Sequence, residues 1–167
     1  MPRTRFQKII FGILMSVTMA YGMEVYNSAI KAGYYLLPGG LSNMTNEVFL
    51  DALIEDTYMW ILVFIFSNLW GNKIGHHLAS KIINPEKENP FFITIIISCC
   101  TVLIMCPTMS LAASIIFNVI LAHNPIIQLP AIWVGTVLKN FPMALLWNLF
   151  AAGPLSRLIF RKLFKQA

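Results

Sequence analysis

The sequence has 167 residues, of which 57% are hydrophobic and only 11% are charged, and its mean hydropathy is +0.70. A soluble domain carries about 25% charged residues, so this composition excludes an ordinary soluble protein and predicts a lipid-covered surface. The net charge of +5 does not indicate nucleic-acid binding, because the basic residues stand at the ends of apolar stretches. The three cysteines lie within one apolar stretch, so no disulfide framework is expected.

Four apolar stretches are long enough to cross a bilayer, which takes about 20 residues in a helix. We therefore predict an all-α integral membrane protein, a single transmembrane domain over residues 1–167. Its spanning helices are expected at residues 9–30, 53–70, 91–117 and 131–152. The first stretch is longer than a signal peptide and no A-x-A cleavage pattern follows it, so we expect it to be a permanent helix.

The ends of these helices have their own signals. The second helix is expected to start near Asn46, to continue through Lys81 as an amphipathic extension, and to stop at Asn84-Pro85. Gly153-Pro154 is expected to end or kink the fourth helix. A basic C-terminal segment follows it.

The basic residues predict the orientation. Ten of the twelve lie on one side of the predicted membrane, and this side is expected to be cytoplasmic with both termini. They are Arg3, Arg5, Lys8, Lys73, Lys81, Lys87, Arg157, Arg161, Lys162 and Lys165, whereas the opposite side holds Lys31 and Lys139.

A weak internal repeat divides the chain into residues 1–84 and 90–167. Met19 and Met23 correspond to Met105 and Met109, and Ser28 corresponds to Ser114. In the second helix of each half, Met59 corresponds to Met143. Each half is then a hairpin of two helices, and the two hairpins enter the membrane from the same side as parallel repeats.

Several sequence segments resemble a known family. They include "YGMEVYN", "NEVFLDALIEDTYMW", "MCPTMSL", "NFPMALLW" and "AAGPLSRLIFR", and the resemblance covers nearly the whole chain. The family consists of small bacterial membrane proteins filed as a domain of unknown function, number twenty-seven ninety-eight in that series. The resemblance implies a bacterial cytoplasmic membrane and a duplicated hairpin; it implies no activity, cofactor or functional residue.

Glu24 is the first candidate functional residue, because an ionisable side chain inside a membrane helix suggests a functional site. It belongs to a stripe of small residues with Gly12, Ser16, Ala20 and Ser28, which favours contact with another helix over contact with lipid. In the second half of the repeat, Ser110 occupies the position that corresponds to Glu24.

Two interpretations of Glu24 are open. Lys139 is expected at similar depth beside Asn140, so a structural Glu24–Lys139 pair or a glutamate reaching toward the interface is one interpretation. The other is a site that handles protons or cations.

Methionines form a second candidate cluster. Met19, Met23, Met105 and Met109 could offer thioether ligands to Cu(I). Methionine also fills gaps between helices, and the spacing is that of one helix face. His76 and His77 diverge by about 100° on a helix, so they do not make a metal-ligand pair; we predict no metal and no cofactor.

No nucleotide-binding loop or catalytic motif is present, so no enzymatic activity is expected. The sequence favours a membrane protein with a structural or interaction role, which it could carry out as a homo-oligomer. Its expected partner is the lipid bilayer, and no nucleic-acid partner is expected. The alternative is a small secondary transporter or channel that uses Glu24.

Overall fold

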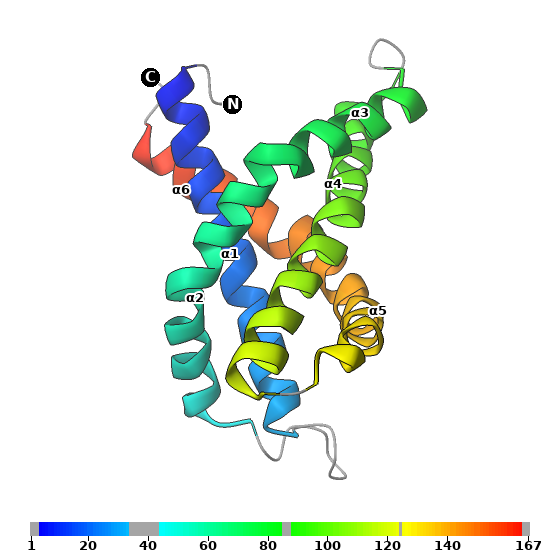
Figure 1. Ribbon diagram of the computed structural model, residues 1–167. Helices are drawn as coiled ribbons and strands as arrows, with labels where there is room; N and C mark the ends of the chain where they lie inside the picture. Colours follow the sequence, from blue (N-terminus) through cyan, green and yellow to red (C-terminus); the bar gives the residue numbers. More distant parts are fainter. Residues whose placement is uncertain (1–3, 34–43, 85–87, 124, 165–167) are drawn as a thin grey trace. The chain divides into compact units, whose positions relative to one another are not determined.

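The computed structural model describes residues 4–33, 44–84, 88–123 and 125–164 (Figure 1). Every regular element in these ranges is a helix, and the helices form four continuous stretches. The predicted all-α fold is therefore confirmed. Arg3, Pro85, Lys87 and Lys165 lie outside the described residues.

The first stretch is α1 (Arg5–Lys31). A capping box starts it: the Thr4 hydroxyl accepts from the Gln7 amide at 3.2 Å, and the Gln7 side chain accepts from the Thr4 amide at 3.3 Å. Gly33 follows the helix with a positive φ of 74°, a conformation that glycine adopts without strain. Both ends of this helix therefore follow from local sequence.

The second stretch joins α2 (Asn46–Phe66), a π-helical segment η1 (Ser67–Gly71) and α3 (Asn72–Ile82). Its start at Asn46 and its extension through Lys81 agree with the prediction. The third stretch joins α4 (Pro90–Ala113) to the π-helical η2 (Ser114–Leu121). The side chain of Asn89 caps α4 by accepting from the Phe91 amide at 2.9 Å.

The fourth stretch joins the 3₁₀ turn η3 (Ile126–Gln128), α5 (Leu129–Trp147), the π-helical η4 (Asn148–Ala152) and α6 (Gly153–Leu163). The helix does not end at Gly153-Pro154 but continues for ten further residues, to Leu163. Pro154 stands in the first turn of α6, a position where proline is well tolerated.

Three of the helical stretches in the described residues are long and apolar enough to cross a membrane: Arg5–Lys31, Pro90–Leu121 and Ile126–Leu163. The second stretch is not among them, and its first half carries Glu47, Asp51, Glu55 and Asp56. A fourth span therefore stays a prediction. Large apolar side chains are widely exposed, for example Ile127 at 85%, as lipid contact requires.

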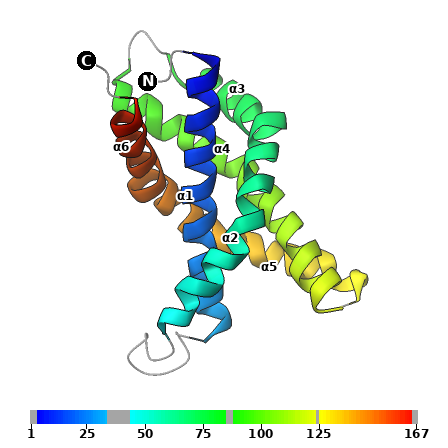
Figure 2. The ribbon, with the colours of Figure 1, turned by 90° about the vertical axis from the view of Figure 1, so that its left-hand side faces the viewer.

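The chain divides into two compact units. The first comprises residues 1–64 and 150–167 and contains α1, α2 and α6. Figure 2 shows α6 beside α1. The Thr18 and Ser156 hydroxyls are 2.9 Å apart, and the rings of Phe11 and Phe160 meet edge to face with centroids 5.6 Å apart. Phe6 and Phe164 also make a ring contact, so the first turn of α1 lies beside the end of α6.

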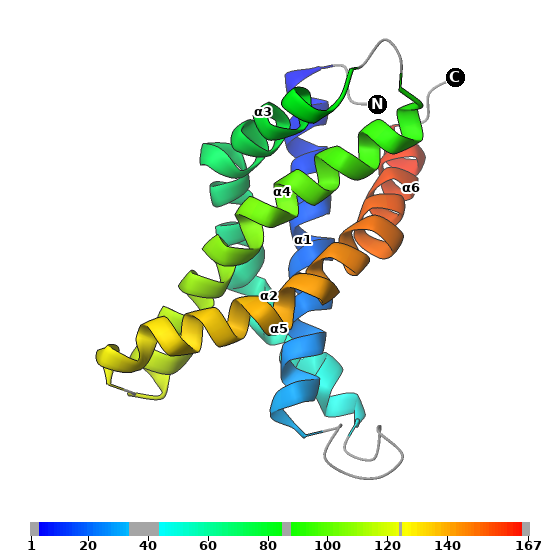
Figure 3. The same cartoon turned by 90° about the vertical axis from the view of Figure 1, so that its right-hand side faces the viewer.

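The second unit comprises residues 65–149 and contains α3, α4 and α5. Figure 3 shows α4 between α3 and α5, and it packs against both. The α3 contact is close at Gly75, where an added Cβ would lie 2.8 Å from the Thr101 Cα. The indole N–H of Trp133 in α5 donates to the Pro107 carbonyl at 2.9 Å and ties α5 to α4.

The two units do not coincide with the halves expected from the sequence repeat. The first unit takes α6 from the second half, and the second unit takes α3 from the first half. The single domain built from two parallel hairpins stays a prediction.

Candidate functional site

The stripe of small residues on α1 is buried, as its composition predicted. Ser16, Ala20, Glu24 and Ser28 are all buried, and Glu24 is only 4% exposed. An added Cβ at Gly12 would lie 3.1 Å from the Phe64 ring of α2. The stripe thus serves contacts within the chain, and it places the Glu24 carboxyl in the interior rather than at the lipid-facing surface.

Acidic residues of α2 surround Glu24. The carboxyl groups of Glu24 and Glu55 are close enough to interact directly, and Asp56 and Lys31 lie within electrostatic range. Lys31 pairs with one carboxyl oxygen of Glu55 at 3.2 Å. We call Glu24, Glu55 and Asp56, together with Lys31, the acidic cluster.

Two oxygens of this cluster accept no hydrogen bond from any described residue. They are Oε2 of Glu55 and Oδ1 of Asp56, and Asp56 is only 5% exposed. Buried acceptors without a donor are costly, and charged ones more so. The cluster holds three carboxyl groups and one ammonium group, so full ionisation would leave a net charge of −2.

A cavity of about 430 Å³ adjoins the cluster at the α1–α2 loop end of the hairpin. Its polar lining comes from Ser28, Lys31, Thr45, Glu47, Asp51 and Glu55. The hydroxyl of Ser28 is buried and has no hydrogen-bond partner in the described structure. The cavity therefore joins an acidic entrance to buried polar groups that lack partners.

The described residues hold no group of three or more His, Cys, Asp or Glu side chains arranged to bind a metal ion. Met19, Met23, Met105 and Met109 are all partly buried. The side chain of Met105 packs against Gly71 of η1, so one of the four methionines has a packing role. Cu(I) binding by this set stays an untested alternative to packing.

Three neutral polar residues of the second unit are also buried: Ser110, Ser114 and Asn140. The predicted repeat pairs Ser110 with Glu24 and Ser114 with Ser28, and its Met59–Met143 register pairs Asn140 with Asp56. The hydroxyl of Ser110 lies 3.9 Å from the Cys106 sulfur, whereas Ser114 and the Asn140 carbonyl oxygen lack partners among the described residues.

Lys139 lies in α5 within the second unit, so the predicted Glu24–Lys139 pair stays a prediction. Within the first unit, Glu24 lies near Glu55 and Asp56, which the sequence analysis did not name as its neighbours. Helix geometry could have identified them. Glu24 lies about 10 Å from the end of α1 and Glu55 about 13 Å from the start of α2, so an antiparallel hairpin brings them to similar depth.

Residues 86–164 match the family model described as a domain of unknown function, DUF2798. This part of the chain is similar to that family. The resemblance to that family is thereby confirmed for α4, α5 and α6. No curated protein and no solved structure matches the chain.

The DUF2798 match covers the C-terminal part of the chain and not the N-terminal part. It includes Ser110, Asn140 and Lys139 but leaves out α1 and α2, which carry the acidic cluster.

Proposed function

We propose that this integral membrane protein moves protons or small cations, and that Glu24 is the group that binds them within the membrane. The observation that carries the proposal is the burial of Glu24 against Glu55, beside an acid-lined cavity. The cavity supplies an approach for a cation, and the cluster supplies the negative charge that holds it.

The chemistry of two adjacent carboxyl groups supports this role. Ionised carboxylates only accept hydrogen bonds, so Glu24 and Glu55 satisfy each other only when one of them carries a proton. A bound cation would serve the same purpose. Lys31 neutralises at most one of the three charges, so the cluster is more stable with a proton or cation bound than without one.

Packing does not require an acid at position 24. Serine occupies the corresponding buried position 110 of the second hairpin. A charged side chain at the centre of a membrane helix costs about 3 kcal/mol on insertion scales. The first hairpin bears this cost at Glu24, whereas the second hairpin, with serine at position 110, does not. This difference favours a functional role for Glu24 over a structural one.

The role that the sequence favoured, a structural or interaction role, would use a small-residue face that is available to a second protomer. Such a face on α1 is already occupied by contacts within the chain. Homo-oligomerisation remains a sequence-based prediction, and the proposed function gives the protein no catalytic role.

The proposed orientation places the acidic cavity outside and the basic chain ends inside a bacterial cytoplasmic membrane. Ten of the twelve basic residues support this orientation through their distribution. The buried positions shared by the two hairpins, Glu24 with Ser110 and Ser28 with Ser114, support parallel repeats. The functional asymmetry then lies in the charge of the first hairpin.

The test is proton and cation flux in proteoliposomes. Purified protein is reconstituted with a pH-sensitive dye inside, and a pH gradient is imposed; parallel vesicles carry Na⁺ or K⁺ gradients. We expect wild-type vesicles to dissipate one of these gradients and Glu24→Gln vesicles to do so no faster than protein-free vesicles. Glu88→Gln, an exposed acid in the linker, is the matched control and keeps wild-type flux. Equal flux through wild-type and Glu24→Gln protein would refute the proposal.

A further inference from the structure

Helix α6 has two distinct faces. Gly153, Ser156 and Phe160 are buried, and the contacts of Ser156 with Thr18 and of Phe160 with Phe11 fix this face against α1. The other face is exposed and carries basic residues. The helix is therefore held in one orientation, with its basic face turned away from α1.

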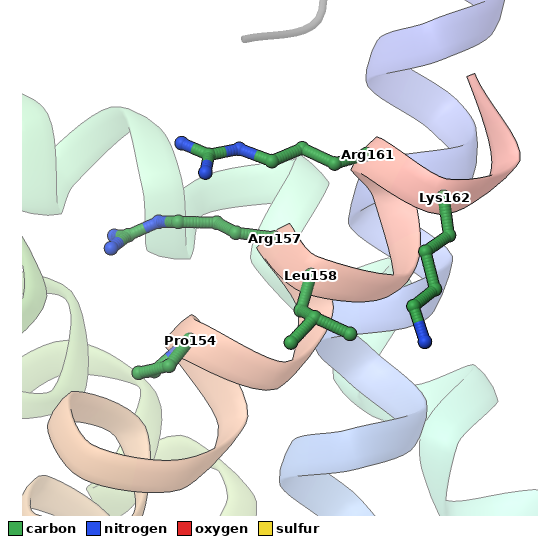
Figure 4. Close-up of a pocket in the computed structure, with 5 residues that line it drawn as sticks. All are labelled: Pro154, Arg157, Leu158, Arg161 and Lys162. Atoms are coloured by element: carbon green, nitrogen blue, oxygen red, sulfur yellow. The ribbon is translucent and has the colours of Figure 1, made fainter. Parts of the chain in front are cut away.

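A cavity of about 580 Å³ lies along the exposed face (Figure 4). It is lined by Pro154, Arg157, Leu158, Arg161 and Lys162. Arg157 and Arg161 extend side by side in the same direction, and Lys162 projects on the other side of Leu158. Three cationic groups thus border one opening whose floor is apolar.

No carboxylate balances this charge. None lines the cavity, and no ion pair in the described part of the chain includes Arg157, Arg161 or Lys162. Two like charges four residues apart on a helix repel each other. An anion between the two guanidinium groups would remove this repulsion and would accept their paired N–H donors.

Apolar side chains on the same helix indicate what kind of anion fits. Leu155, Leu158 and Leu163 are large and exposed, and they alternate with the basic residues along α6. A basic helix with exposed leucines suits the boundary between lipid headgroups and acyl chains. Free phosphate would satisfy the arginines but would leave the leucines uncovered.

The geometry points to a binding site for the phosphate group of an anionic phospholipid at Arg157, Arg161 and Lys162. The two arginines hold the phosphate oxygens, Lys162 adds charge from the far side of Leu158, and the acyl chains cover the leucines. This site is separate from the acidic cluster and does not depend on the proposed transport of cations.

Native mass spectrometry of the full-length protein tests the site. Detergent-solubilised protein is titrated with phosphatidylglycerol, with phosphatidylcholine of the same acyl chains, and with inorganic phosphate. We expect preferential binding of phosphatidylglycerol. Arg157→Gln/Arg161→Gln should weaken it roughly twenty-five-fold, since each basic side chain at an anionic surface contributes about fivefold. The control Lys73→Gln/Lys81→Gln removes two exposed lysines from the amphipathic α3 and should change binding little.

Three outcomes would overturn the inference. One is equal binding of phosphatidylglycerol and phosphatidylcholine by wild-type protein, a measurement that needs no variant. Another is unchanged phosphatidylglycerol binding by Arg157→Gln/Arg161→Gln. The third is inorganic phosphate binding as tightly as phosphatidylglycerol, which would assign the site to a soluble anion. Should the glutamine variant fail to fold, Arg157→Lys/Arg161→Lys replaces it, with a smaller but measurable loss expected because lysine cannot bind bidentately.

Discussion

Substitution of Gly75 by alanine tests the packing of α3 on α4. The added Cβ would lie 2.6 Å from the Thr101 Oγ1, 2.8 Å from the Thr101 Cα and 3.0 Å from the Thr101 amide nitrogen. Because two of these atoms belong to the backbone, a side-chain rotation cannot relieve the overlap, and the helices must move apart.

The magnitude follows from two opposing effects. Overpacking a close contact costs about 1–3 kcal/mol, and a backbone clash puts Gly75→Ala at the upper end. Alanine regains about 1 kcal/mol of helix propensity relative to glycine, so we expect a net loss of about 2 kcal/mol. For a chain of this length, that loss lowers the midpoint of thermal unfolding by roughly 4–8 °C.

The assay is thermal unfolding in detergent, with Gly135→Ala as the matched control. Nothing in the described structure lies within 4 Å of a Cβ at Gly135, so this control should leave the midpoint unchanged or raise it. Gly71→Ala should fall between the two, since the atoms in its way belong to the flexible Met105 side chain. A Gly75→Ala midpoint equal to that of Gly135→Ala would refute the close α3–α4 contact.

Three further substitutions test other contacts by the same unfolding assay. Asp56→Asn should raise the midpoint, because it removes a buried carboxylate whose Oδ1 has no donor; a lowered midpoint would mean that the charge is structurally paired. Ser156→Ala should cost about 0.6 kcal/mol, a usual value for a hydrogen bond between membrane helices, through loss of its 2.9 Å contact with Thr18, and no change would show that the contact does not hold α6. Trp133→Phe should cost about 1 kcal/mol through loss of the hydrogen bond to the Pro107 carbonyl, and an unchanged midpoint would place α5 differently on α4.

Sequence patterns predicted the helices well where local chemistry decides. The start at Asn46 and the stop before Asn84 depend on nearby polar residues and proline, and the structure has both. At Gly153-Pro154 the sequence left an end and a kink open, and the structure excludes the end. Proline in the first turn of a helix removes no hydrogen bond that the helix needs. The sequence alone does not show whether Pro154 begins a further helical segment or ends the helix.

The candidate site was only partly predictable. Burial of Glu24 follows from the small residues at every fourth position, a local pattern. Its neighbours Glu55 and Asp56 lie on α2, so residue spacing on α1 does not indicate them; the signal that would have identified them is their similar depth in an antiparallel hairpin. Lys139 lies in the other unit, so its pairing with Glu24 stays a prediction from charge and depth.

If Glu24 carries charge through the membrane, transport by this protein produces an electrical current. Vesicles containing the protein are adsorbed on a solid-supported membrane and exposed to a step in pH, and then to steps in Na⁺ and K⁺. Our account predicts a transient current for wild-type protein with at least one of these ions, and none for Glu24→Gln protein that is folded and incorporated equally well. Currents of equal size from the two proteins, or no current from wild-type protein with any of the three ions, would contradict it.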